Sequence, residues 1–309
     1  MTIDAALARA FGDRVGRRVD LAPFTTFRIG GPADWLLDAV DAADLVTAVR
    51  IARTFGVPLV MLGGGSNVLV SDRGVRGLVV RRRAGEATLE PPGHVRADAS
   101  MSVNGLVRWT VSRGLAGLES WAGTPGTVGG AMFGNAHFRG SLIGDLVESV
   151  RVVTREGEID DLAGEALGFA YDRSRFQTSG EIVLSVVFRV APGAPAALRE
   201  AAKTSLAFRK QTQPLNLPSA GCIFRNGMAG DAGWHEGLPR SAGALLDQVG
   251  LKGARVGGAI VSPVHANFIV NEGGATAADV KALIDRCRDE VARRFGVVLQ
   301  EEIVYLGEW

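Results

Sequence analysis

Glycine constrains this chain more than any other residue type, because 41 of the 309 residues are glycine where average usage of about 7% would give roughly 22. Two clusters stand out: Gly63-Gly64-Gly65-Ser66-Asn67, directly after an apolar run, and the segment 123–135. Without a Cβ atom, backbone reaches left-handed conformations and lets other groups approach closely. The fold must therefore bring bare backbone together at these two places.

The composition excludes several classes of protein. Charged residues make up 22%, apolar residues 47%, and the net charge is +1, so the chain is neither disordered nor an obvious polyanion binder. The one compact basic run, Arg81-Arg82-Arg83, follows an apolar segment and is typical of a solvated strand end. No nucleic-acid partner is expected.

The sequence also indicates where the protein is located and whether it binds a metal. No signal-type segment opens the chain and no 18 apolar residues run together, so neither export nor membrane insertion is expected. Cys222 and Cys287 fit neither a disulfide framework nor a metal-site spacing. The four histidines form no metal spacing either. The sequence favours a cytoplasmic protein without a metal.

Apolar periodicity outlines the organisation. It predicts helices over 44–55, 102–113, 195–210 and 279–295, with Asp44 as the N-cap of the first. Strands are predicted over 57–62, 77–80, 150–154 and 182–190. Pro192, Gly193 and Pro195 indicate a linker. A chain of this length can bury more than one core, and the predicted domains are 1–81, 82–208 and 209–309.

The glycine clusters favour a phosphate-bearing ligand. The first is neither a P-loop, since no Gly-Lys-Ser/Thr follows, nor a helix-opening dinucleotide motif, since Val68-Leu69-Val70 looks extended. Taken alone, it equally fits a tight turn. The second cluster again combines bare backbone with hydroxyl and amide donors. Two such loops in adjacent units suggest one long ligand, such as a dinucleotide, whose backbone donors converge on its phosphates.

Six ordered motifs, from about residue 20 to the end, resemble the family of UDP-N-acetylenolpyruvoylglucosamine reductases. They are Thr25-Thr26-Phe27-Arg28-Ile29-Gly30-Gly31-Pro32-Ala33, Gly63-Gly64-Gly65-Ser66-Asn67-Val68-Leu69, Gly123-Thr124-Pro125-Gly126-Thr127-Val128-Gly129-Gly130, Pro218-Ser219-Ala220-Gly221-Cys222-Ile223-Phe224-Arg225-Asn226, Gly250-Leu251-Lys252-Gly253 and His265-Ala266-Asn267-Phe268-Ile269-Val270-Asn271.

The resemblance implies an α+β fold: a vanillyl-alcohol-oxidase-type (PCMH-like) FAD-binding module of two subdomains, followed by a C-terminal α+β substrate-binding domain. It implies non-covalent FAD, with NADPH and UDP-N-acetylglucosamine enolpyruvate using one cleft in turn. The flavin N5 would pass hydride to the enolpyruvyl group, giving UDP-N-acetylmuramate for peptidoglycan synthesis. The short connections after Cys222 indicate the subclass that lacks an extra tyrosine-bearing loop.

Binding residues follow from the same resemblance. Those implied for FAD are Gly63, Gly64, Gly65, Ser66, Asn67, Gly123, Thr124, Gly126, Thr127, Gly129, Gly130 and Asn135. Those implied for the substrate are Tyr171, Arg209, Gln213, Arg225 and Asn226.

Two residues are implied in catalysis. Cys222 stands where many members of the family carry a serine as proton donor, and a thiol with an ordinary pKa near about 8.5 gives up its proton more readily than a hydroxyl. Taken alone, it would be a small buried residue. Glu302 takes the place of the family's C-terminal glutamate, which stabilises the enolate-like charge when it carries a proton. Its neighbour Glu301 is expected to be solvated, since side chains alternate along a strand.

The position of the catalytic cation departs from the family motif. The family motif is Tyr-Arg-x-Ser, whereas this chain reads Tyr171-Asp172-Arg173-Ser174. Arg173 is favoured as the catalytic cation, and local pairing with Asp172 or Glu181 is the alternative. His137 also departs from the family, which commonly has a small residue there. His265 is expected to orient a turn.

Two other functions are alternatives. A flavin oxidase of the same fold would give Cys222 and Glu302 no evident purpose, and a nucleotide-binding homologue without catalysis would follow if the exchange at 172–173 abolished turnover. A flavin-free phosphate-binding protein is a further possibility that a yellow colour would remove. A monomer is expected, because no apolar stripe is left over.

Overall fold

The computed structural model describes residues 1–83, 85–228 and 230–309 and forms two compact units. Unit 1 comprises residues 1–19, 34–64 and 77–209, and unit 2 comprises residues 20–33, 65–76 and 210–309. Each unit is therefore assembled from three separate stretches of chain. The finer division into domains 1–81, 82–208 and 209–309 remains a prediction.

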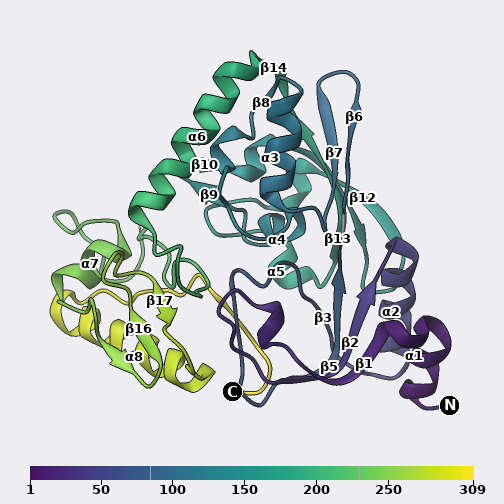
Figure 1. Ribbon diagram of the computed structural model, residues 1–309, viewed down its shortest axis with the longest axis horizontal. Coiled ribbons are helices and arrows are strands. Elements are labelled where there is room, and N and C mark those ends of the chain that lie inside the picture. Colours follow the sequence, from purple (N-terminus) through teal and green to yellow (C-terminus); the bar gives the residue numbers. More distant parts are fainter. Residues whose placement is uncertain (84, 229) are drawn as a thin grey trace. The chain divides into compact units, whose positions relative to one another are not determined.

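The larger sheet of unit 1 has five strands in the order β12-β11-β13-β7-β6, and every neighbouring pair is antiparallel (Figure 1). These strands are β6 (Ala87–Glu90), β7 (His94–Asp98), β11 (Val147–Val153), β12 (Ile159–Ala163) and β13 (Ile182–Arg189). Helices α3 (Val103–Ser112) and α4 (Val128–Phe133) pack on it, and their apolar residues share one core with β7, β11 and β13.

A second sheet has four strands in the order β1-β2-β5-β3. Its strands are β1 (Val15–Asp20), β2 (Pro32–Ala39), β3 (Leu59–Met61) and β5 (Val75–Arg82). Helices α1 (Ile3–Phe11) and α2 (Ala42–Thr54) cover it with a separate core that includes Leu7, Leu45 and Leu78. Strand β3 pairs in parallel with β5, and the first glycine cluster follows the end of β3.

The remaining elements of unit 1 include one long helix, α6 (Pro195–Thr212), whose last three residues belong to unit 2. The others are short: β8 (Leu115–Ala116), β9 (His137–Phe138), β10 (Ser141–Leu142), β14 (Ala191–Pro192) and α5 (Phe176–Ser179).

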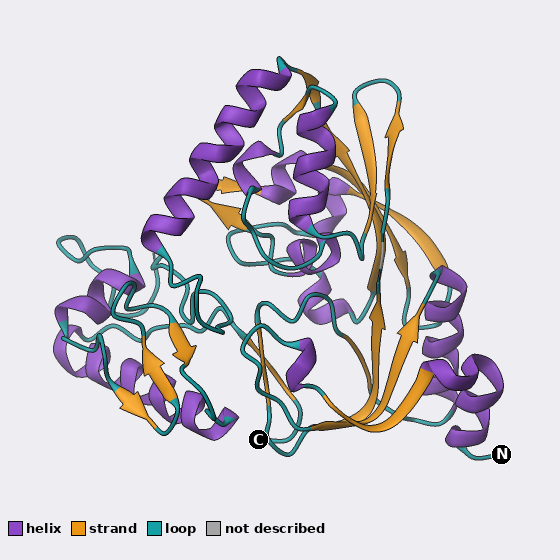
Figure 2. Cartoon of the chain, in the orientation of Figure 1, coloured by secondary structure: helices purple, strands orange, loops and turns teal. Residues whose placement is uncertain are grey.

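Unit 2 carries a three-stranded antiparallel sheet of β15 (Arg255–Val256), β16 (Ala259–Val261) and β17 (Ile269–Asn271). Figure 2 shows these short strands beside helix α8 (Ala277–Phe295), which presents Val280, Ile284 and Cys287 to the core. Helix α7 (Ala242–Gln248) joins the same core, and β4 (Val68–Val70) pairs in parallel with β18 (Val304–Leu306).

The predicted helices and strands are present, with three local differences. The N-cap of α2 is Asp41, whereas Asp44 lies in its first turn and pairs with Arg14. The second glycine cluster contains a six-residue helix, α4, that sequence did not predict. The predicted linker at 192–195 is not loose: β14 pairs with β8, and the Gly193 N–H donates to the Gly114 carbonyl at 2.8 Å.

Candidate active site

The two glycine clusters meet in unit 1. A Cβ atom on Gly63 would lie 2.7 Å from Thr127 Oγ1, and one on Gly64 would lie 2.7 Å from the Cα atom of Gly126. Gly63 and Gly64 are exposed, and Gly126 takes a φ of 92°. Within the described residues, the N–H groups of Gly64 and Gly126 donate to no protein acceptor. Bare backbone with spare donors suits a pyrophosphate, so these loops fit FAD.

The second loop is held rigidly behind this contact. The Thr127 side chain caps α4 by accepting from the Gly130 N–H at 3.3 Å, and the Gly129 N–H donates to the Ala99 carbonyl at 2.8 Å. At the start of the loop, the Gly123 N–H donates to Asn104 Oδ1 at 2.6 Å. The predicted FAD-binding residues of this cluster therefore lie on one fixed turn, with one exception.

Asn135 is that exception, because it is fully buried. Its Oδ1 accepts from the Gly144 N–H at 2.9 Å, and its Nδ2 donates to the Ala170 carbonyl at 2.8 Å. Its side chain joins the end of the second glycine cluster to the segment around Tyr171.

The rest of the first cluster belongs to unit 2. Gly65 has a φ of 62°, and a Cβ there would lie 2.2 Å from the Phe24 carbonyl oxygen. Asn67 donates from Nδ2 to the Glu302 carbonyl at 3.0 Å, and its own carbonyl accepts from Val304 at 2.9 Å. Ser66, between them, is half-buried. This part of the cluster anchors the C-terminal segment of the chain.

Cys222 lies in unit 2 on a short ribbon, residues 222–225, that has partners on both sides. On one side, Cys222 forms a bridge with Phe268, and the Ile223 N–H donates to the Asn267 carbonyl at 2.8 Å. On the other, the Glu302 N–H donates to the Ile223 carbonyl at 2.8 Å, and Phe224 is paired with Glu301. Cys222 as a whole is half-buried. The two predicted catalytic residues of this unit thus lie on adjacent, hydrogen-bonded segments.

The two neighbouring glutamates have different surroundings. Glu301 forms an ion pair with Arg288 and keeps only 18% of its side chain exposed. The expectation of a solvated Glu301 was therefore wrong, because helix α8 brings Arg288 against it. Glu302 is half-buried and lies next to the Cys222 ribbon through its backbone.

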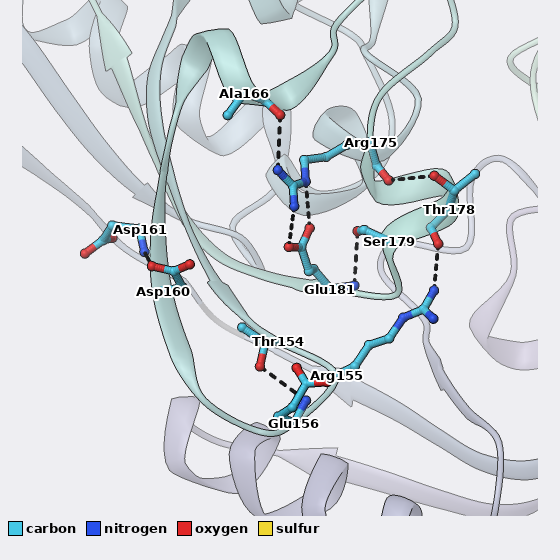
Figure 3. Close-up of polar contacts among 10 residues, drawn as sticks. All are labelled: Thr154, Arg155, Glu156, Asp160, Asp161, Ala166, Arg175, Thr178, Ser179 and Glu181. Atoms are coloured by element: carbon cyan, nitrogen blue, oxygen red, sulfur yellow. Dashed lines mark hydrogen bonds and ion pairs between the residues drawn. The ribbon is translucent and has the colours of Figure 1, made fainter.

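Residues 170–173 of unit 1 form a tight turn in which Ala170 and Arg173 exchange two backbone hydrogen bonds of 3.1 Å. Asp172 adopts a φ of 51°. Arg173 is exposed and makes no ion pair within the part of the chain that is described. Glu181 pairs instead with Arg175, which also donates to the Ala166 carbonyl (Figure 3). The alternative pairing of Arg173 with Glu181 is not found.

Sequence reasoning missed an aromatic and cationic cluster in unit 1. The rings of His137 and Tyr171 lie 4.4 Å apart, and the Arg209 guanidinium lies 3.9 Å from the centre of the Phe138 ring. Arg209 is buried and donates to Thr124 Oγ1 at 2.8 Å. Burial and the positive charge of Arg209 lower the pKa of His137. Tyr171 and Arg209 were predicted as substrate residues and His137 as a departure from the family, but their grouping into one cluster was not predicted.

The remaining predicted substrate residues lie in unit 2. Gln213 is half-buried just before Pro214. Arg225 pairs with Asp231 at 3.1 Å and also donates to the Gln300 side chain. Asn226 is exposed, and its Oδ1 accepts from the Ala242 N–H at the start of α7. Arg225 and Asn226 continue the ribbon that carries Cys222.

Two family models match the chain. Residues 34–163 match the FAD binding domain, and residues 213–306 match the C-terminal domain of UDP-N-acetylenolpyruvoylglucosamine reductase. The first match agrees with the glycine loops and confirms the predicted cofactor and the α+β, PCMH-type fold class. The fold and the loops define an FAD-dependent oxidoreductase.

Whole-chain comparisons identify the family. The UDP-N-acetylenolpyruvoylglucosamine reductase of Gloeobacter violaceus is 40% identical over 96% of this chain and 97% of its own length. Reductase 2 of Symbiobacterium thermophilum is 42% identical over 95% and 92%. The crystal structure of the Thermus caldophilus reductase superposes with a TM-score of 0.78 at 36% identity, covering 95% and 99%. This chain belongs to the UDP-N-acetylenolpyruvoylglucosamine reductase family, whose members act in peptidoglycan synthesis.

Two further features are absent from the described residues. Across residues 1–83, 85–228 and 230–309, no three His, Cys, Asp or Glu side chains gather as they would around a metal ion. In the same residues, no helix has the length and apolar character needed to cross a membrane.

Proposed function

We propose that this chain reduces UDP-N-acetylglucosamine enolpyruvate to UDP-N-acetylmuramate at the expense of NADPH, with Cys222 as the proton donor. The observation that carries this proposal is the ribbon at 222–225, which is hydrogen-bonded to the segment that bears Glu302. A proton donor and a carboxyl group on adjacent backbone segments suit the protonation of a developing enolate.

The residues proposed to hold FAD are the glycine-cluster set, with Gly64 and Gly126 supplying backbone donors. The chemistry that bound FAD supplies is transfer of hydride from NADPH to the methylene carbon of the enolpyruvyl group. The chain must then hold the substrate, stabilise the charge left on the neighbouring carbon and deliver one proton to that carbon.

Cys222 delivers that proton from its thiol, and the resulting thiolate takes a proton back from solvent before the next turnover. Glu302, when it carries a proton, donates a hydrogen bond to the substrate carboxylate as negative charge grows there. Arg173 supplies the positive charge, and its side chain, which is exposed and makes no ion pair among the described residues, supports that role. Glu302 and Arg173 would thus stabilise the additional charge that develops as hydride is transferred.

Recognition of the UDP-sugar is proposed for five residues: Tyr171, Arg209, Gln213, Arg225 and Asn226. Arg225 already pairs with Asp231, so a bound phosphate would share a guanidinium that the protein has fixed in place. The active species is proposed to be a monomer.

An anaerobic experiment tests the assignment. The purified yellow protein is reduced with NADPH, the enolpyruvyl UDP-sugar is added, and the oxidised flavin spectrum is followed. Its return without oxygen supports the reductase. A flavin that stays reduced until air is admitted contradicts the reductase and favours the oxidase. Cys222→Ala should leave reduction by NADPH within about 2-fold of the parent and slow reoxidation by substrate at least about 100-fold.

A further inference from the structure

Asn267 holds the Cys222 ribbon with its side chain. It is buried, with 3% of its surface exposed. The Phe224 N–H donates to its Oδ1 at 2.9 Å, and its Nδ2 donates to the Phe224 carbonyl at 2.7 Å. The backbone carbonyl of Asn267 also accepts from Ile223. One residue therefore makes three hydrogen bonds to the two residues that follow Cys222.

The chemistry of asparagine explains this arrangement. Its amide carries an acceptor and a donor side by side, so it can pair with both backbone groups of one residue as a neighbouring strand would. The opposite edge of Phe224 faces Glu301, which precedes Glu302. Removing the Asn267 amide would leave two buried backbone groups without partners and would loosen the ribbon between the two proposed catalytic residues.

Asn267 is itself fixed by His265. The Asn267 N–H donates to His265 Nδ1 at 3.2 Å, and the His265 ring packs edge-on against Phe268 with their centroids 5.0 Å apart. A Cβ on Gly243 would lie 2.8 Å from His265 Cε1, so glycine makes room for the ring. Phe268, in turn, bridges Cys222. The turn at 265–268 thus contacts the ribbon at Cys222, Ile223 and Phe224.

We propose that Asn267 is a positioning residue that fixes the Cys222 thiol for proton transfer. This inference rests on the proposed function of Cys222. Proton transfer requires the donor and acceptor atoms within hydrogen-bond reach, and a displacement of about 1 Å in a catalytic group can slow a reaction about 100-fold. Asn267 sets that position from outside the reacting groups.

A double-mutant cycle tests the proposal. Asn267→Ala should slow substrate-driven flavin reoxidation at least about 10-fold while changing reduction by NADPH less than about 2-fold. In a Cys222→Ala background, the same substitution should change reoxidation less than about 2-fold, because the group it positions is gone. Equal slowing in both backgrounds, or slowing of both half-reactions alike, would overturn the proposal.

Alkylation of Cys222 by iodoacetamide gives a second readout that does not require turnover. Burial raises the pKa of Cys287 to about 12, so the measured rate at neutral pH reports on Cys222. Asn267→Ala should change this rate at least about 3-fold, whereas the matched control Asn271→Ala should not. Asn271 is a comparably buried asparagine whose side chain bonds Phe27, Gly273 and Ala275 instead. Identical alkylation rates in the parent and Asn267→Ala would overturn the proposal.

Two further variants separate a failure of folding, and a failure of the proposed function, from a failure of this proposal. If Asn267→Ala does not fold, Asn267→Asp retains the acceptor for Phe224 but loses the donor, and it should show the same selective slowing of reoxidation. If Cys222→Ala reoxidises as fast as the parent, then Cys222 is not the proton donor and the proposed function fails. In that case the alkylation rates still decide whether Asn267 fixes the thiol.

Discussion

Gly64 and Gly126 contact each other through bare backbone: a Cβ on Gly64 would lie 2.7 Å from the Cα atom of Gly126. Gly64→Ala should therefore push the two loops apart and weaken FAD binding at least about 10-fold, or about 1.4 kcal/mol. Fluorescence titration of the apoprotein with FAD measures this. Gly134→Ala is the control, because a Cβ there would meet no atom nearer than 3.9 Å. Equal FAD affinity in the two variants would contradict the prediction.

Of the two adjacent glutamates, Glu301 is expected to contribute to stability and Glu302 to catalysis. Glu301→Gln removes a partly buried charge from its pair with Arg288 and should lower the free energy of unfolding by about 1–2 kcal/mol. Glu302→Gln should leave stability within about 0.5 kcal/mol and lower kcat at least about 10-fold. Urea unfolding and steady-state kinetics on both variants measure the difference. The reverse pattern would assign the enolate-stabilising role to Glu301.

The exchanged pair at 172–173 gives a third prediction. Arg173→Ala should lower kcat/KM about 100-fold, or about 2.7 kcal/mol. The double variant Asp172→Arg/Arg173→Asp restores the family order but places arginine at a φ of 51°, a conformation that aspartate accepts more readily. We expect this double variant to be less stable than the parent by about 1 kcal/mol. A double variant as stable as the parent would contradict the conformational argument.

Arg209 is expected to stabilise the second glycine cluster through Thr124 and to lower the pKa of His137. Arg209→Met keeps much of the packing on Phe138 but removes the hydrogen bond to Thr124 and the positive charge. FAD affinity should fall at least about 3-fold, and the pKa of His137 should rise, since Arg209 is one cause of its lowering. Titration of the His137 ring by NMR in both proteins measures the second effect. An unchanged pKa would show that burial alone lowers it.

Stability should fall as the pH drops below 6.5. Burial lowers the pKa of both His137 and His265 from the ordinary value of 6.5. Between the lowered pKa and 6.5 the unfolded chain binds protons that the folded chain does not, so stability is full above 6.5 and is lost as the pH falls through this window. Each histidine contributes a slope of at most about 1.4 kcal/mol per pH unit. Denaturant unfolding at pH 7.5 and at pH 5.5, for the parent and for His137→Phe, should show a smaller loss in the variant.

Much of the fold could be predicted from the sequence because the signals were local. Apolar periodicity indicated α2, α3, α6 and α8, and the two glycine clusters suggested loops that share one phosphate-bearing ligand. Helix α4 was missed because two of its six residues are glycine, which disfavours helix. Its Thr127 cap and its buried Val128 and Met132 stabilise it instead. Tertiary packing overrides weak propensity in such short helices.

The site was harder to predict where distant segments meet. His137, Tyr171 and Arg209 are far apart in sequence, so nothing local indicated that they share one cluster. Asn267 was recognised within a family motif, but a polar residue in an apolar stretch does not reveal which backbone groups it bonds. Glu301 was misread because strand alternation says nothing of the helix that brings Arg288 to it.

The three-part construction of unit 2 also sets the order in which this chain can mature during synthesis. Segments 20–33 and 65–76 emerge from the ribosome early, yet their partners come from residues 210–309. Asp72 accepts from the Ala277 and Ala278 N–H groups at the start of α8, and Phe27 and Leu69 belong to the same core as that helix. Until the C-terminal segment is made, these apolar side chains lack their native cover, which is the condition in which nascent chains aggregate or recruit chaperones. Truncation of this protein from its C-terminus should therefore expose apolar side chains in segments 20–33 and 65–76, which lie early in the sequence.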